Sequence, residues 1–200
     1  SGASTGALEA HELRDKDVSR YRGKGVQNAV RHIRDIIAPA CIGFDVTDQA
    51  AIDQQLATLD GTDNLSYLGA NATLAVSLAV MQAAAASKHC ETYAHLLSTE
   101  SYTMPVPFMN ILNGGQHANN RVDIQEFMIV PTGFDSFKRA LQAGCEIYHA
   151  LGRILLDKGY STSVGDEGGF APDLHCHDEA FEHITLAVKK AGYTLGHDIM

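Results

Sequence analysis

Two acidic residues stand inside a glycine-rich stretch of the sequence. Asp166 and Glu167 lie between Gly165 and the pair Gly168-Gly169. Because glycines leave the backbone with little side-chain cover, such a loop can bring a carboxyl group against a ligand, where it could act as a general acid. A solvated acidic turn is the commoner use of this composition, and the residues alone leave both interpretations open.

A histidine follows a second glycine-rich stretch. Residues 113–117 read Asn-Gly-Gly-Gln-His and come directly after an apolar run. His117 could therefore donate a hydrogen bond to an anion or carry a proton near neutral pH. A lone loop histidine is more often structural or simply exposed, so this residue too has two interpretations.

Gln125 and Glu126 lie in a mostly apolar stretch, residues 124–130, that predicts a buried strand ending at Pro131. Regular pleating would send their side chains to opposite faces of the sheet. Both could reach one site only if the strand has a bulge or an irregular end. Otherwise, a structural hydrogen bond for a buried glutamate is the default interpretation.

The first six residues, Ser-Gly-Ala-Ser-Thr-Gly, form a small hydroxyl-bearing segment that could close over a phosphate or a metal ion. It is not a Walker A loop, because no Gly-Lys-Ser/Thr follows at the required spacing. Taken alone, the segment would be a linker in most proteins.

Residues 175–178, His-Cys-His-Asp, have the composition of a metal-binding tract. Alternate side chains diverge, however, whereas a metal site needs three or four ligands that converge. The start of a helix is the favoured interpretation, because Asp178 and Glu179 would suit the positive end of a helix dipole.

The elements that must position these residues fall into two regions, and we predict domains over 1–102 and 103–200. The first region is mainly helical: residues 26–33 predict a helix that ends before Pro39, and residues 52–59 a helix that ends at Gly61. The uncharged, alanine-rich stretch 67–87 predicts a helix buried in a globular core rather than a membrane span.

The second region predicts two strands followed by two helices. The strands cover 107–112 and 124–130, and Asp135 or Ser136 can cap the first helix. The apolar positions expected to face the core of these helices are Phe137, Leu141, Cys145, Tyr148 and Leu155 in the first, and Phe181, Ile184, Val188 and Ala191 in the second.

The composition, 45% apolar and 20% charged over 200 residues, is that of a folded soluble protein. A net charge of -9 with scattered Lys and Arg argues against a nucleic-acid partner. Four widely spaced cysteines without a CxxC pair predict neither a disulfide framework nor a structural zinc site, which favours a reducing cytoplasm. We also expect no signal peptide.

The order and wording of the motifs together resemble the enolase family, from Ser1 to Ile199. The matching motifs are SGASTG, ELRD, GKGV, LDGT, LGANA, AVSLA, MPVPFMNILNGG, DIQEFMI and VGDEGGFAP. The chain departs from the usual pattern at Leu65, where a lysine is common, and at Asn119-Asn120-Arg121 after His117. The implied fold is α/β with an α+β cap: the mainly helical part of an N-terminal capping domain, then the initial ββαα portion of an enolase-type (β/α)8 barrel.

The resemblance implies an Mg2+-dependent lyase that interconverts 2-phosphoglycerate and phosphoenolpyruvate. Glu167 matches the general acid, which protonates the hydroxyl that leaves carbon 3. His117, Gln125 and Glu126 match residues at the substrate, and His117 and Glu126 are expected to take part in catalysis with Glu167. Glu126, if close, could supply a like charge beside the acid. Ser4 matches a mobile-loop serine that helps bind a second magnesium ion.

The resemblance also implies that the three magnesium carboxylates, the base lysine and the phosphate-binding residues of the family lie beyond Met200. An isolated chain of these 200 residues is then expected to be inactive. By the same analogy we expect a cytoplasmic homodimer in the full-length protein, with no membrane span and sometimes display at the cell surface or secretion.

Overall fold

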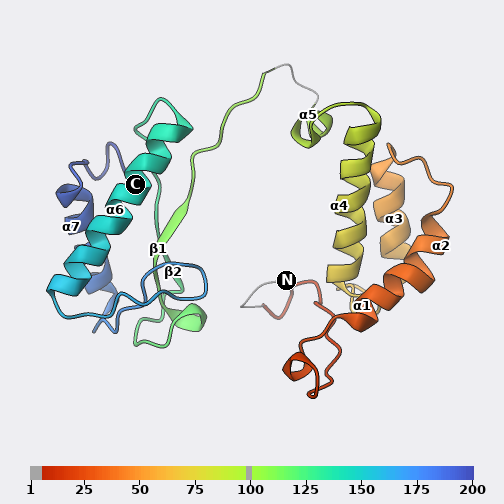
Figure 1. Ribbon diagram of the computed structural model, residues 1–200, viewed down its shortest axis with the longest axis horizontal. Coiled ribbons are helices and arrows are strands. Elements are labelled where there is room, and N and C mark those ends of the chain that lie inside the picture. Colours follow the sequence, from red (N-terminus) through yellow and green to blue (C-terminus); the bar gives the residue numbers. More distant parts are fainter. Residues whose placement is uncertain (1–5, 98–100) are drawn as a thin grey trace. The chain divides into compact units, whose positions relative to one another are not determined.

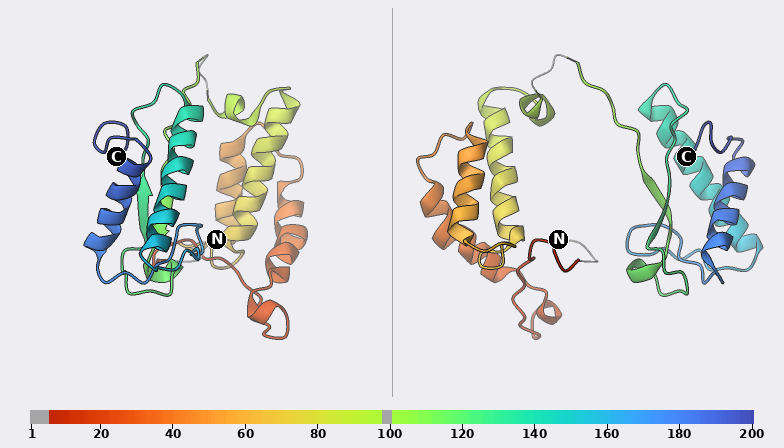
Figure 2. Two further views of the ribbon diagram at one scale, coloured as in Figure 1. Left: turned by 60° about the vertical axis from the view of Figure 1, so that its left-hand side comes forward. Right: turned by 180° about the vertical axis from the view of Figure 1, so that it is seen from behind.

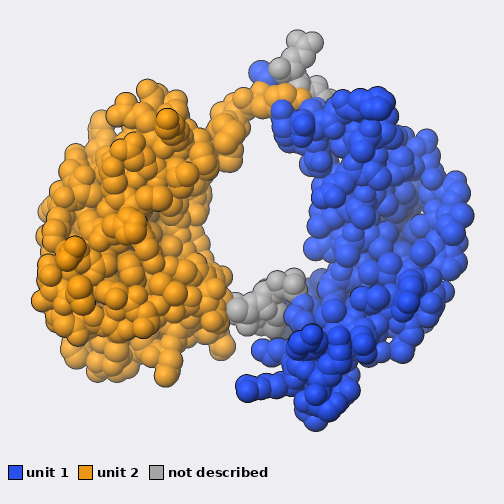
Figure 3. Space-filling model, viewed as in Figure 1, with its two compact units in different colours: residues 1–101 blue, residues 102–200 orange. Residues whose placement is uncertain are grey.

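The computed structural model describes residues 6–97 and 101–200 of the chain. They belong to two compact units, Ser1–Ser101 and Tyr102–Met200, which Figure 3 shows in different colours. Each unit has its own hydrophobic core, and the two are described separately below.

Helices make up the regular structure of the first unit (Figure 1). Their bounds are Tyr21–Gly23 (η1), Gln27–His32 (α1), Ile33–Ile37 (η2), Ala38–Cys41 (α2), Gln49–Asp60 (α3), Ala70–Ser87 (α4) and Thr92–Leu96 (α5). The core of this unit consists of Ala29, Ile37, Ile52, Leu56, Leu68 and Ala72.

The prediction that the first helix ends before Pro39 is wrong. A π-helical stretch, η2, follows α1 directly, and α2 then continues through Pro39 to Cys41. Proline lacks an N–H and its ring clashes with the carbonyl four residues earlier in an α-helix. The wider π turn removes that conflict, so the helical path passes the proline.

The helix predicted to end at Gly61 is confirmed. The Asp48 side chain accepts a hydrogen bond from the Ala51 N–H at the start of α3, and Gly61 ends it with a φ of 67°. The left-handed conformation at that position is one that glycine adopts without strain.

The alanine-rich stretch forms α4, which lies beside α3 (Figures 1 and 2). By length and composition, α4 is the one helix in the described ranges that could cross a membrane, and 22% of it is buried. The expected burial in a core therefore holds only for a stripe that includes Ala72, Ala84 and Ala85. Leu74 and Leu78, on the remaining surface of the helix, are exposed.

The second unit consists of a two-stranded sheet and two long helices. Its elements are Met109–Asn113 (β1), Gly115–His117 (η3), Glu126–Ile129 (β2), Phe137–Asp157 (α6) and His177–Lys190 (α7). The strands pair antiparallel, with Met109 opposite Ile129 and Asn113 opposite Glu126. The register shifts between Asn110 and Leu112, which makes the strand irregular where it approaches the loop.

Both helices pack on the strands through a single core, and they lie side by side (Figure 2). The predicted core face of α6 is wrong in part, because Leu141 and Cys145 are exposed. The face that is buried instead contains small residues that carry little hydrophobic signal in the sequence. Its members are Ala140, Ala143, Gly144, Ile147, Leu151, Ile154 and Leu155. In α7, Ile184 and Val188 are buried as expected, whereas Phe181 is exposed.

A third segment joins the sheet through Phe170. This residue pairs in parallel with Leu112 of β1 and antiparallel with Val164. Its N–H donates to the Ile111 oxygen at 3.0 Å, and its oxygen accepts from the Asn113 N–H at 2.8 Å. The acidic loop between Val164 and Phe170 is therefore held against the end of β1.

Candidate functional site

The glycines after β1 shape the loop that carries His117. Main-chain bonds from Gly114 to the Gln125 oxygen (3.0 Å) and from Gly115 to the Val122 oxygen (2.6 Å) close this loop. A Cβ at Gly114 would lie 2.4 Å from two carbonyl oxygens, and Gly115 has a φ of 53°. Side chains at both positions would disrupt the loop, which explains the Gly-Gly pair.

His117 is buried, with 4% of its surface exposed, and its imidazole Nε2 lies at the centre of the site. Nε2 is 3.2 Å from Glu167 Oε1 and 3.9 Å from Glu126 Oε1. The amide nitrogen of Gln125 is 2.6 Å from the same atom. Nδ1 is buried and finds no hydrogen-bond partner in the described part of the chain.

The contacts of His117 bear on which ring nitrogen carries the proton. A proton on Nδ1 would be a buried donor without an acceptor among the described residues, which is costly. A proton on Nε2 faces the carboxylate of Glu167 at hydrogen-bond distance. The Gln125 amide nitrogen, at 2.6 Å, is itself a donor and suits an unprotonated Nε2, so the contacts with Glu167 and with Gln125 require opposite tautomers.

Gln125 and Glu126 reach the same site because the strand begins irregularly. β2 starts at Glu126, and Gln125 lies just outside it in a bend. The amide nitrogen of Gln125 is 3.4 Å from Glu126 Oε1, so the two side chains lie on the same side. Here the strand end has the irregularity that the sequence required for both residues to share a site.

The acidic loop is closed on itself and fixed to the His117 loop. The Gly165 N–H donates to the Gly169 oxygen at 2.8 Å, and the Asp166 N–H donates to the His117 oxygen at 3.1 Å. A Cβ at Gly165 would lie 2.5 Å from that same His117 oxygen. The glycine thus permits a close backbone approach that brings Glu167 to the imidazole.

Other residues that the sequence did not single out hold Glu167 and its loop. Glu167 Oε2 accepts a hydrogen bond of 3.4 Å from the Asn110 amide. Tyr148 donates to the Gly168 oxygen at 3.0 Å and stacks on Phe170 with ring centroids 4.3 Å apart. Burial raises the pKa of Tyr148, so its hydroxyl keeps the proton that it donates.

Both units match known family models. Residues 1–96 match the model described as "Enolase, N-terminal domain", and residues 101–200 match "Enolase, C-terminal TIM barrel domain".

The chain belongs to the enolase family. Its mixture of helices and few strands fits an α/β partial enolase, and the family is one of lyase-type enzymes with a metal cofactor. The resemblance read from the motifs is therefore confirmed.

Among the described residues, His117, Glu126 and Glu167 form a possible metal-binding triad. Ligand atoms of His117, Glu126 and Glu167 all lie within 4.8 Å of one another. One imidazole with two carboxylates suits a borderline ion such as Zn2+, whereas Mg2+ prefers oxygen ligands in a regular octahedron. The triad alone is therefore a poor match for magnesium.

Of the five site residues predicted from the sequence, His117, Gln125, Glu126 and Glu167 lie together in the structure. Ser4 lies outside the described residues. Residues 175–178 span the start of helix α7, which begins at His177; the His175 N–H donates to Glu179, and His177 Nε2 accepts from the Asp123 N–H. They thus serve the start of a helix. Asn110 could have been noticed as a polar residue inside an apolar strand, whereas Tyr148 has no such signal.

Proposed function

We propose that this chain supplies the acid side of an enolase active site that dehydrates 2-phosphoglycerate to phosphoenolpyruvate, with Glu167 as the general acid. The observation that carries the proposal is the meeting of Glu167 and Glu126 around His117 Nε2, at 3.2 Å and 3.9 Å. Two carboxylates around one imidazole form a cluster that can hold a proton beside a substrate.

The reaction requires an acid that protonates the hydroxyl leaving carbon 3. A base removes the proton on carbon 2, the carbon 2–carbon 3 double bond forms, and the carbon 3–oxygen bond breaks. Glu167 gives its proton to the departing hydroxyl, which leaves as water. The Glu167 side chain is 39% exposed, so it can regain a proton from solvent after each turnover.

The neighbours of Glu167 have separate tasks in this proposal. His117 and Asn110 each contact one oxygen of its carboxyl group and so fix its direction. Gln125 and Glu126 bind the substrate, the amide through its donors and the carboxylate through a substrate hydroxyl. Because ligand atoms of His117 and Glu126 lie within 4.8 Å of the acid, we place both in the catalytic group.

The same proposal includes a bound magnesium ion. We infer that Mg2+ binds through oxygen ligands that include the Ser4 hydroxyl, rather than through the triad with its imidazole. Bound there, the metal would supply charge stabilisation for the developing anion.

We further propose the wider properties that the family suggests. The second unit would be the initial ββαα portion of the barrel, and the first would belong to the capping domain. The full-length protein would act as a cytoplasmic homodimer, without a membrane span or direct contact with nucleic acid. Display at the cell surface or secretion would be an additional location.

A second candidate is that the 200-residue chain by itself binds the substrate without converting it. One observation favours it: the ligand triad found in the described ranges consists of the proposed acid and its two neighbours. A metal held by these side chains would occupy the groups needed for proton transfer.

Ultraviolet absorbance of phosphoenolpyruvate, after adding 2-phosphoglycerate and Mg2+ to the purified chain, tests both candidates. Glu167→Gln should reduce turnover by about 10²- to 10⁴-fold if the residue is the acid. Glu182→Gln, at an exposed glutamate on α7, is the matched control and should leave turnover unchanged.

Each outcome has a distinct meaning. Turnover that Glu167→Gln leaves intact would overturn the acid assignment. Absent turnover, together with NMR shifts at His117 on adding 2-phosphoglycerate, would support the second candidate. The absence of both turnover and shifts would overturn the second candidate, whereas the first is decided by the effect of Glu167→Gln in a preparation that turns over the substrate.

A further inference from the structure

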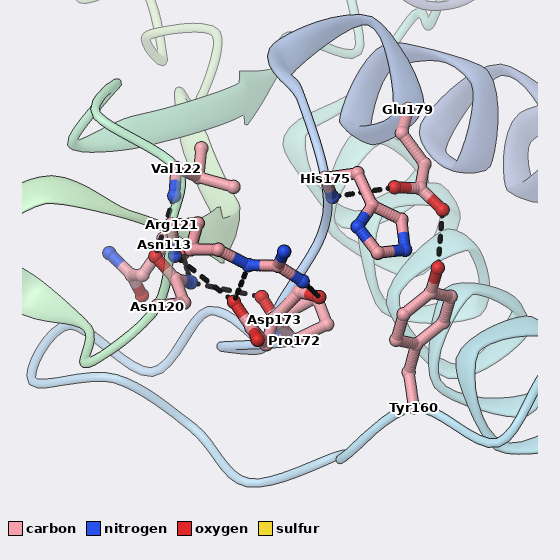
Figure 4. Close-up of polar contacts among 9 residues, drawn as sticks. All are labelled: Asn113, Asn120, Arg121, Val122, Tyr160, Pro172, Asp173, His175 and Glu179. Atoms are coloured by element: carbon pink, nitrogen blue, oxygen red, sulfur yellow. Dashed lines mark hydrogen bonds and ion pairs between the residues drawn. The ribbon is translucent and has the colours of Figure 1, made fainter.

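We propose that Asn120 and Arg121 are positioning residues that clamp the His117 loop to the segment after the acidic loop, and so fix the spacing of His117 and Glu167. This proposal rests on the proposed function of that pair. Figure 4 shows the two residues reaching across to Pro172 and Asp173.

Asn120 joins three backbone segments through one side chain. Its amide nitrogen donates to the Asn113 oxygen and to the Pro172 oxygen, both at 3.0 Å. Its Oδ1 accepts from the Val122 N–H at 3.2 Å. The end of β1, the exit of the His117 loop and the exit of the acidic loop therefore meet at a single partly buried amide (Figure 4).

Arg121 adds a second attachment beside the first. Its Nε is 2.9 Å from Asp173 Oδ1, its own N–H donates to that oxygen at 3.2 Å, and a terminal nitrogen reaches the Asp173 main-chain oxygen at 3.4 Å. The planar guanidinium and the backbone N–H of Arg121 thus bind Asp173 at several points. A lysine side chain could not form the same set of contacts.

The clamp sits where the two loops leave the site. On the entry side, Phe170 is already paired with β1, and Asp166 donates to the His117 oxygen. On the exit side, the Asn120 amide and the Arg121–Asp173 pair connect the two loops. Without these contacts the His117 loop would keep its own main-chain closure from Gly115 to the Val122 oxygen, but its exit would lose the attachment to the segment after the acidic loop, and the imidazole could move relative to Glu167.

The charge and exposure of Arg121 and Asp173 indicate that their pairing acts on the two loops rather than on global stability. The side chains of Arg121 and Asp173 are 57% and 60% exposed, so the pair adds little to global stability. The Arg121 hydrogen bond lowers the pKa of Asp173, which keeps the pair charged at neutral pH. Arg121 also lies in the short stretch where the sequence departs from the usual enolase pattern.

Hydrogen exchange of two backbone amides tests the clamp in the 200-residue chain. The Asp166 amide reports the contact between the loops, because it donates to the His117 oxygen, whereas the Phe170 amide reports the sheet, because it donates to Ile111. Asn120→Asp and Arg121→Gln should each speed exchange at Asp166 by about tenfold, with little change at Phe170.

Controls separate positioning from a general loss of stability. Arg153→Gln, at an exposed arginine on α6, should change neither amide, and Arg121→Lys should restore protection only in part. The NMR signals of the His117 ring should shift in Asn120→Asp and stay in place in Arg153→Gln.

Equal acceleration at both amides, or none at either, would overturn the clamp. These readouts need no substrate, so they stand apart from the proposed function. If Glu167→Gln fails to alter turnover or binding while Asp166 still loses protection in Asn120→Asp, the function is wrong and the clamp is right.

Discussion

The hydroxyl of Tyr148, on helix α6, donates a hydrogen bond of 3.0 Å to the main-chain oxygen of Gly168 in the acidic loop. Tyr148→Phe removes this bond but keeps the stacking on Phe170. We expect the free energy of unfolding to fall by about 0.5–1.5 kcal/mol, measured by urea denaturation followed by circular dichroism. Tyr148→Ala should cost more, because it also removes the ring contact. Equal losses in both variants would contradict a role for the hydroxyl.

Alanine substitutions at Gly165 and Gly168 should lower the stability of the protein for different reasons. A Cβ at Gly165 would lie 2.5 Å from the His117 oxygen, whereas Gly168 has open space around it but a φ of 83°. We expect Gly165→Ala to cost about 1–3 kcal/mol of stability through crowding and to expose the Asp166 amide to exchange. Gly168→Ala should cost about 1–2 kcal/mol through backbone strain and leave that contact intact. Unchanged Asp166 exchange in Gly165→Ala would refute the proposed crowding.

The stability of the first unit at acid pH should depend on Asp60. Burial alone would raise the pKa of Asp60, but hydrogen bonds from Thr62 and Leu68 outweigh it and hold that pKa below the ordinary value. The Leu68 N–H donates to Asp60 Oδ2 at 2.6 Å. Because the pKa is lower in the folded state, the stabilisation is present above the unfolded pKa of about 3.9 and is lost as pH falls through the folded value.

Asp60→Asn tests this dependence. We expect a loss of about 1–3 kcal/mol at neutral pH and a weaker dependence of stability on pH in the acid range. NMR signals of the first unit followed during acid titration give the measurement, and Asp63→Asn, at a nearby exposed residue, is the control. An identical acid transition in Asp60→Asn and in the parent chain would contradict the prediction.

The hydroxyl of Tyr193 should lose its proton only at unusually high pH. Its hydroxyl donates to Glu146, and this bond raises the pKa of Tyr193 to about 12. The raised pKa means that the contribution to stability is complete below the unfolded pKa of about 10 and disappears as pH rises through 12. Glu146→Gln should return the tyrosine toward ordinary titration, as read from tyrosinate absorbance. A normal titration in the parent chain would show that the bond is absent in solution.

The local pattern of the sequence was enough to find the chemically interesting loops. Glycines flank both the acidic pair and the segment ending in His117, and that signal is local. What the pattern does not contain is the pairing of Phe170 with β1, which joins segments far apart in the chain. The convergence of His117 and Glu167 was therefore expected from the family resemblance and the order of its motifs.

The errors in the fold have equally local causes. The core face of α6 was misplaced because Ala143 and Gly144 look unremarkable by hydrophobicity, although Met109 packs closely over Gly144. The helix through Pro39 was cut short because a π turn has no reliable sequence signature. The pairing of Arg121 with Asp173 could likewise not be predicted, since no local sequence rule connects the two residues.

The pairing of Phe170 on both sides has a consequence for how a ligand could be enclosed. The turn is closed by main-chain bonds from Gly165 to Gly169 and from Ala171 to Ser163, and Phe170 is bonded to the adjacent strand, so the backbone of the turn moves with the sheet. The proposed acid is thus a stationary part of the site. Any segment that closes over a substrate must travel toward Glu167, because Glu167 does not travel toward the substrate.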